Sequence, residues 1–178
     1  MPRVRLLRIR RKYPEGVDRG LSEQQLATYF ALTEVGNLLE QAVTAQLRAD
    51  GDLSPVQFQI LATLGTSPST DHRMTDLADR IVYSRSGFTY QAGQLEKRGL
   101  IERKPSPHDE RSTVVTLTAA GRDVLATVMP GHVDVVRGLL FEDVPQRDLD
   151  ALQRVLGPVR DRLRQAPPRS ARSRRARG

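Results

Sequence analysis

The amino-acid sequence predicts a mainly α fold that contains one small β-hairpin. Along most of the 178 residues, apolar side chains recur at intervals of three and four, in segments that begin at Ser or Thr and end near Gly, as amphipathic helices do. After Gly99 this period changes. Residues 100–104 and 113–117 form two short strand-like runs on either side of a polar loop, 105–112, and this arrangement indicates a hairpin.

The chain is expected to open with a basic arm, residues 1–20, and a long first helix, residues 21–52. Ser22 and Gln25 have the spacing of a capping box, in which each side chain bonds the other residue's backbone N–H. The helix is expected to end near Gly51, and its wide apolar stripe predicts packing against more than one element. The stripe consists of Leu26, Phe30, Val35, Leu38, Leu39, Ala42, Val43 and Leu47.

Three further helix starts precede the hairpin. Ser54, Thr75 and Ser84 each stand where a capping residue would open a helix. The last two of these helices are joined by a tight turn at residues 82–83 and match a helix-turn-helix, whose second helix can enter a major groove. The hairpin that follows is then a wing. Residues 53–118 are therefore predicted to form a winged helix-turn-helix lobe.

The remaining helices are expected within residues 119–165. Thr118 caps the first of them, Pro130 is expected to kink or split it, and the final helix begins after Pro145. Together with the first helix they are too apolar for the winged lobe alone to cover. The tail, residues 166–178, is rich in Pro, Arg and Ser and cannot bury enough apolar surface to fold by itself.

The net charge of +7 comes from the two ends of the chain. Residues 1–12 and 166–178 are rich in Arg and contain no acid, and without them acidic groups outnumber basic ones. The tails either add sequence-independent affinity for nucleic acid or are solubilising ends. The stretch from Arg80 to Lys104 is different, because its basic residues outnumber its glutamates by four. A phosphate-contacting element needs such an excess, although an ordinary solvated helix face can also have it.

Several classes of protein are excluded or disfavoured. The chain contains no Cys, which excludes disulfides, thiolate metal ligands and a cysteine nucleophile. His72, His108 and His132 have no metal-ligand spacing, and no Gly-rich phosphate-binding motif is present, so we expect neither an enzyme nor a bound cofactor or metal. No apolar run reaches the ~20 residues that span a bilayer. A cytoplasmic protein without membrane contact is expected.

Several segments, in order along residues 22–165, resemble the MarR family. The resemblance is specific because the segments occur together, and the wing sequence within that context is the most telling of them. The matching segments are LSPVQFQIL at 53–61 (opening helix of the core), MTDLA at 74–78 (short strand and third helix), SRSGFT at 84–89 and LEKRGLIER at 95–103 (recognition helix and first wing strand), and DERS at 109–112 with VTLTAAG at 115–121 (wing tip and second wing strand).

The resemblance implies a homodimer that regulates transcription, usually by repression. Residues 21–52 and 119–165 would intertwine about a two-fold axis, so that two lobes bind a pseudo-palindrome in double-stranded DNA. It also implies a small effector, aromatic or phenolic, held between the dimerisation helices and the DNA-binding lobe. Phe30, Phe58 and Leu61 either line that pocket or belong to the core. The alternative function is a winged-helix module that binds a protein partner rather than DNA.

The expected DNA contacts lie on the recognition helix and on the wing. Short hydroxyl side chains on the first turns let the helix backbone approach DNA, and Ser84 is also the cap. In the wing, Arg111 is expected to enter the minor groove and Asp109 to orient it. The expected contacts are Ser84, Arg85, Ser86, Thr89, Tyr90, Gln94, Arg98, Arg103, Lys104 and Arg111.

The recognition helix departs from the family pattern at residues 90–94. Many relatives carry Arg directly after the Thr and an Asp-Arg pair before the Leu-Glu, whereas this chain has YQAGQ. The absence of these two Arg side chains argues against guanine-directed readout, and Gln94 suits adenine instead. Gly93 inside a helix costs ~1 kcal/mol relative to Ala. It therefore indicates either a close approach to a partner or tight packing against another helix.

Overall fold

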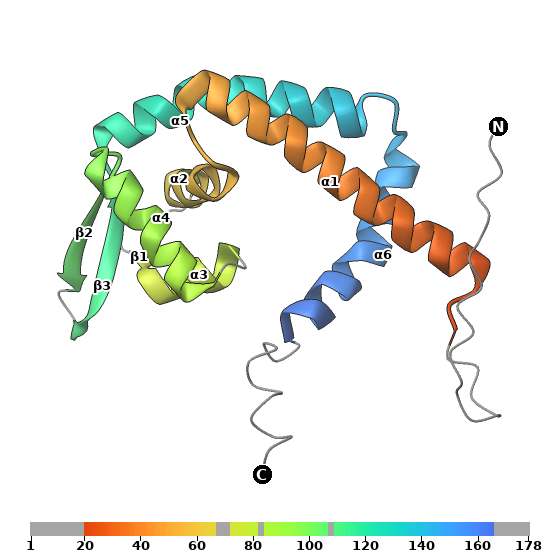
Figure 1. Ribbon diagram of the computed structural model, residues 1–178, viewed down its shortest axis with the longest axis horizontal. Coiled ribbons are helices and arrows are strands. Elements are labelled where there is room, and N and C mark those ends of the chain that lie inside the picture. Colours follow the sequence, from red (N-terminus) through yellow and green to blue (C-terminus); the bar gives the residue numbers. More distant parts are fainter. Residues whose placement is uncertain (1–19, 67–71, 82–83, 107–108, 166–178) are drawn as a thin grey trace, which may run out of the picture. The chain divides into compact units, whose positions relative to one another are not determined.

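The computed structural model describes residues 20–66, 72–81, 84–106 and 109–165 (Figure 1). The predicted arm and tail lie outside the described residues, apart from Gly20. The chain comprises two compact units, Met1–Leu38 and Leu39–Gly178. The elements are α1 (Glu23–Gly51), α2 (Pro55–Thr66), β1 (His72–Arg73), α3 (Met74–Ile81), α4 (Arg85–Lys97), β2 (Ile101–Ser106), β3 (Asp109–Leu117), α5 (Ala119–Val136), the π-helix η1 (Arg137–Phe141) and α6 (Gln146–Gln165).

The described part of the first unit is the N-terminal part of α1. The capping box is confirmed, because Ser22 N–H donates to Gln25 Oε1 at 2.9 Å and Gln25 N–H donates to Ser22 Oγ at 3.2 Å. The apolar side chains of this segment are mostly exposed, and the rings of Tyr29 and Phe30 lie next to each other with centroids 5.6 Å apart. The N-terminal part of the predicted apolar stripe is therefore mostly exposed, whereas its last member, Leu47, is fully buried.

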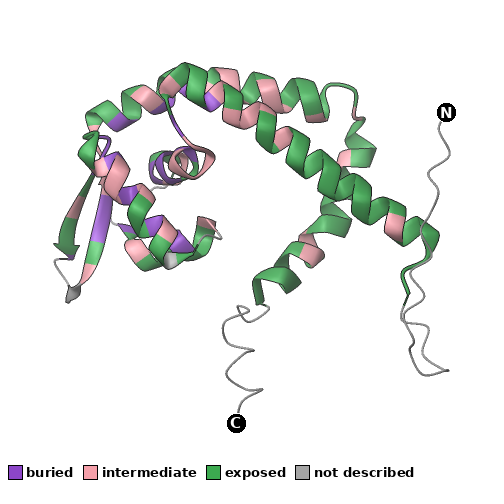
Figure 2. Cartoon of the chain, viewed as in Figure 1, coloured by how far each residue is buried: buried purple, intermediate pink, exposed green. Residues whose placement is uncertain are grey.

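The second unit holds the hydrophobic core, which is built around α2. Helices α3, α4 and α5 and strand β3 all contact α2 (Figure 1), and Ser54 and Gln57 form a second capping box at its start. Buried side chains gather in this lobe, whereas α6 is exposed along most of its length (Figure 2). The largest fully buried side chains are Phe88, Leu47, Leu53, Ile60, Leu61, Leu77, Leu95, Ile101, Val115 and Val128.

Three strands form an antiparallel sheet in the order β1-β3-β2. The predicted loop at 105–112 is wrong in extent, because β2 continues to Ser106 and β3 begins at Asp109. Pro105 pairs with Thr113, and an irregularity after Pro105 brings Ser106 opposite Asp109. Proline is tolerated here because β2 is an edge strand, where one N–H per pair of residues faces away from the ladder. The wing is consequently longer than the sequence predicted.

Two helix boundaries also differ from the prediction. Helix α3 begins at Met74, so the predicted cap Thr75 lies inside it. Helix α5 begins at the predicted cap, where Thr118 Oγ1 accepts from Gly121 N–H at 3.0 Å, and it continues through Pro130 without a break. Pro130 is exposed, so that water can bond the carbonyl that loses its partner. The irregularity comes later, in η1.

Helix α5 packs closely on the lobe. A methyl group at Gly121 would lie 2.0 Å from the carbonyl oxygen of Leu100, so only glycine fits against the start of the wing. By length and composition alone, Ala119–Phe141 is the one described helical stretch that could cross a membrane, with mean hydropathy 1.4. This is weak evidence for a membrane segment, because Leu125 and Val128 of the same stretch belong to the lobe core.

Candidate nucleic-acid interface

Helix α4 has one buried face and one exposed face. Phe88, Ala92 and Leu95 are almost completely buried in the core of the lobe. Ser84 caps the helix by accepting from Gly87 N–H at 3.2 Å, as expected from the sequence. The opposite face, at the spacing i, i+3, i+4, i+7, carries Ser86, Thr89, Tyr90, Gly93 and Lys97.

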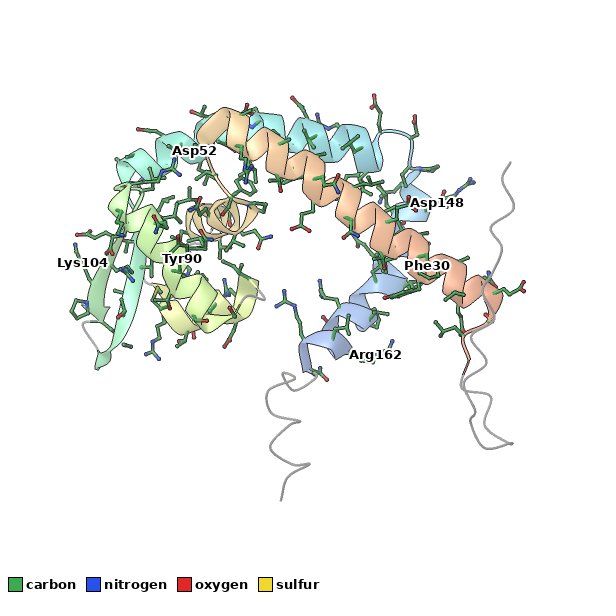
Figure 3. All side chains as sticks on the ribbon, viewed as in Figure 1. Phe30, Asp52, Tyr90, Lys104, Asp148 and Arg162 are labelled. Carbon is green, nitrogen blue, oxygen red and sulfur yellow. The ribbon has the colours of Figure 1, made fainter. Side chains whose placement is uncertain are left out.

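Tyr90 is the most prominent side chain of this face. It is 64% exposed, and Figure 3 shows it on α4. No described residue pairs with Lys97, whose side chain is exposed one turn beyond Gly93. Gln94 is half-buried at the margin of the face. The face thus presents two hydroxyls, an aromatic ring and an ammonium group, which are groups that bond base edges and phosphates.

Gly93 is half-buried and lies beside Tyr90 and Lys97, on the side of α4 that points away from Leu95 and Phe88. A methyl group at Gly93 would meet no other side chain and no other element within 4 Å. The alternative explanation, tight packing against another helix, is therefore wrong within the described part of the chain. A glycine that costs ~1 kcal/mol of helix stability relative to alanine has no reason for its presence in the packing of this lobe.

Arg98 ends the recognition helix and joins it to α1. Its guanidinium donates to the backbone carbonyls of Asp52 at 2.7 Å and Gly51 at 3.0 Å. Gly99 follows with φ +71°, and the bonds from Gly99 N–H to Glu96 O and from Leu100 N–H to Leu95 O form a Schellman motif. The DNA contact expected for Arg98 stays a prediction, and the structure adds an intramolecular role.

The wing is tied to α4 by an ion pair. Glu96 accepts from Nε of Arg103 at 2.8 Å and from its Nη2, and both side chains are about one-third exposed. The hydrogen bond from Arg103 lowers the pKa of Glu96, against a smaller opposing effect of burial, and raises the pKa of Arg103 in return. Arg103 thereby fixes the start of β2 relative to the recognition helix.

Lys104 is an exposed basic residue on β2 (Figure 3). Its ammonium lies 2.9 Å from the carboxylate of Glu102, but both side chains are more than half exposed, so the pair is weak and can exchange for a phosphate. The side chains of Arg85, Asp109 and Arg111 lie outside the described part of the chain. The predictions for these three residues, including the orientation of Arg111 by Asp109, stay predictions.

Comparison with known proteins identifies the family. A sequence model described as MarR family matches residues 51–112. A solved structure of Sco3205, a MarR family transcriptional regulator from Streptomyces coelicolor in complex with DNA, is 31% identical. The match covers 84% of this chain and 93% of that one, with a TM-score of 0.79. The chain belongs to the MarR family.

Curated MarR relatives are also transcriptional regulators rather than enzymes. The HTH-type transcriptional regulator MhqR of Bacillus subtilis is 25% identical over 138 residues, which cover 76% of this chain and 93% of MhqR. The transcriptional repressor MprA of Escherichia coli is 28% identical over 143 residues, 80% of each chain. The winged helix fold expected from the sequence is thus confirmed for this MarR-family regulator.

Sequence reasoning missed two links that hold α4 in place, although it named Arg103 as a DNA contact, which stays a prediction. Gln57 Nε2 donates to Gln91 Oε1 at 3.0 Å, which links α2 to α4, and the pairing of Glu96 with Arg103 links α4 to the wing. Gln91 is a polar residue next to the apolar face of α4, and this position was a signal for the first link. No local pattern indicated the second.

The effector pocket suggested for Phe30, Phe58 and Leu61 stays a prediction. Phe58 and Leu61 belong to the core cluster of the lobe. Phe30 belongs to the other compact unit, and its side chain is 58% exposed.

Proposed function

We propose that the chain is a homodimeric, sequence-specific DNA-binding regulator that represses transcription by occupying a pseudo-palindromic operator. The observation that carries the proposal is the exposed face of α4, which places Ser86, Thr89, Tyr90 and Lys97 opposite a buried apolar face, with the wing beside it. A helix of this kind fits into the major groove of B-DNA. The proposed mode of action is repression, in which a dimer on two successive half-sites would exclude polymerase from that DNA.

Uncovered apolar side chains support the homodimer. Exposed apolar side chains in such number mark a protein interface. Leu21 precedes α1, and the others belong to α1, to α5 with η1, and to α6, where the sequence predicted the dimerisation region. The exposed apolar side chains are Leu21, Tyr29, Phe30, Leu32, Val35, Leu38, Val133, Leu139, Phe141, Leu152, Val155, Leu156 and Leu163.

For the small aromatic or phenolic effector, the contact between α1, α2 and α5 is the proposed site, in place of Phe30 and Leu61. The ring of His132 lies against Phe58 with centroids 4.4 Å apart. Among the described residues, none bonds the buried atoms His132 Nδ1 and Gln46 Oε1. A phenol offers a hydroxyl donor for such acceptors and a ring for Phe58.

The test begins with selection of bound duplexes from a random pool by the full-length chain, followed by footprinting and sedimentation. We expect the protein to sediment as a dimer and to give a footprint with dyad symmetry. Simple phenols such as 4-hydroxybenzoate should lower the affinity of the protein for the duplex. If no duplex shows salt-sensitive binding, the proposal is contradicted, and a winged-helix module that binds protein is favoured. A footprint without dyad symmetry would contradict the dimer.

A further inference from the structure

The exposed face of α4 has a notch beside Tyr90 and Lys97. Gly93, which is half-buried, lies there on the side of the helix that points away from the buried Leu95 and Phe88. One turn to either side lie the exposed ring of Tyr90 and the exposed side chain of Lys97. The missing side chain therefore leaves a small depression between two larger ones.

The packing of the described residues gives no reason for this glycine. A methyl group at Gly93 would meet open space, whereas at Gly121 it would lie 2.0 Å from a backbone oxygen and at Gly51 2.5 Å from Val128 Cγ2. The backbone of α4 is regular and has no positive φ before Gly99. Glycine is the least favourable helix residue after proline, so a residue retained at this place without a packing role suits a partner that comes close to the backbone.

The atoms that line the notch decide which chemical group can bind there. Its floor is the Cα of Gly93, and the N–H groups of a helix interior are occupied by the helix's own hydrogen bonds, so the notch offers no donor to a phosphate or a base nitrogen. It suits a small apolar group. In the major groove the apolar group that projects from a base edge is the C5-methyl of thymine.

We propose that Gly93 is a specificity-determining position, at which the recognition helix receives a thymine methyl group against its backbone beside the ring of Tyr90. The inference rests on the proposed DNA-binding function and adds to it the base that this position reads. One thymine in each half-site is then required, and its methyl group, rather than its hydrogen-bonding edge, is what the protein recognises.

The experiment uses the full chain and the duplex that it selects from a random pool. Each thymine is replaced in turn by deoxyuridine, which removes only the methyl group. For the unmodified protein, one position in each half-site should weaken binding about fourfold, the effect of one buried carbon, and replacement in both half-sites about fifteenfold. The Gly93→Ala variant fills the notch with its own methyl group, so its affinity for the thymine duplex should fall at least about fivefold. Deoxyuridine removes the competing thymine methyl group, so neither replacement should weaken binding by this variant, and each should restore part of the lost affinity.

Gly36→Ala is the matched control, because Gly36 also lies inside a helix and a methyl group there also meets nothing within 4 Å. Both alanine variants should raise the melting temperature by about 2–4 °C, since alanine favours the helix, and only Gly36→Ala should keep the response to deoxyuridine. The inference fails, while DNA binding stands, if the unmodified protein binds a duplex but deoxyuridine changes its affinity no differently from that of Gly93→Ala at every thymine position. If no duplex is bound, the proposed function fails and the inference with it.

Discussion

The Nη1 group of Arg98 donates a 2.7 Å hydrogen bond to the backbone carbonyl of Asp52, which connects the end of the recognition helix α4 to the end of α1. Carbonyls at a helix C-terminus have no intrahelical partner and carry partial negative charge, so a guanidinium is a favourable cap. Asp52 itself has φ +49°, a conformation that closes the end of α1. Arg98 thus fixes the orientation of α4 at its C-terminal end.

Replacing Arg98 by Met removes this connection and keeps the aliphatic stem. We expect the free energy of unfolding to fall by about 1 kcal/mol, less than for buried charge-assisted bonds because Arg98 is exposed. Urea unfolding followed by circular dichroism measures the change. Lys97→Met is the control, since the two variants lose the same charge on adjacent residues and no described residue pairs with Lys97. Equal urea midpoints for the two variants would contradict the role of Arg98.

Local signals in the sequence predicted most helix starts correctly, and the cap predicted at Thr75 is the exception. The predicted capping box at Ser22 and the predicted caps Ser54, Ser84 and Thr118 are confirmed by hydrogen bonds. Each depends on residues within one turn, so the chain specifies them without tertiary contacts. The buried and exposed faces of α4 followed in the same way from its apolar periodicity.

Features that depend on distant residues were not predictable from the sequence. The length of the wing depends on pairing of Pro105 with Thr113 across the strands, and the bond of Arg98 to Asp52 spans 46 positions. The residues next to an Arg in a basic segment are the same whether its side chain contacts DNA or a backbone carbonyl, so the local sequence does not reveal its partner. Only the three-dimensional contacts separate the residues that position the interface from those that are free to contact DNA.

The pair between Glu96 and Arg103 predicts a stability change at acidic pH. Its hydrogen bond lowers the pKa of Glu96 in the folded chain, so the carboxylate stabilises the fold above its ordinary pKa of 4.5, and this contribution is lost as the pH falls through the lowered value. At pH 7, Glu96→Gln should cost about 1 kcal/mol or less, because the pair is partly exposed. The difference in melting temperature between the two proteins should shrink between pH 6 and pH 3. A constant difference would contradict the assignment.

His132 predicts a change of the same sign in a different pH range. Burial lowers its pKa below the ordinary value of 6.5 in the folded chain. As the pH falls below 6.5 the unfolded chain therefore takes up this proton first, and the folded state loses stability until the lowered pKa is passed. Between pH 7.5 and pH 5.5 the melting temperature should fall more for the unmodified chain than for His132→Gln. His72 and His108 are common to both proteins, so parallel curves would show that His132 is not the group responsible.

Tyr90 and Lys97 should contribute to DNA binding in different ways, although both are exposed on one face of α4. Lys97 presents a charge without a described partner, and its binding to a phosphate releases counterions. Lys97→Ala should weaken all duplexes alike and reduce the slope of log K against log salt by about 0.9 for each phosphate that is no longer neutralised. Tyr90→Ala removes an uncharged ring, so it should leave this slope unchanged and alter which duplexes the chain selects.

Arg154→Ala is the control, because it removes the same charge from the exposed surface of α6. It should change neither the salt slope nor the selection of duplexes. A slope that changes equally in Lys97→Ala and Arg154→Ala would mean that overall charge, rather than this face of α4, attracts the DNA.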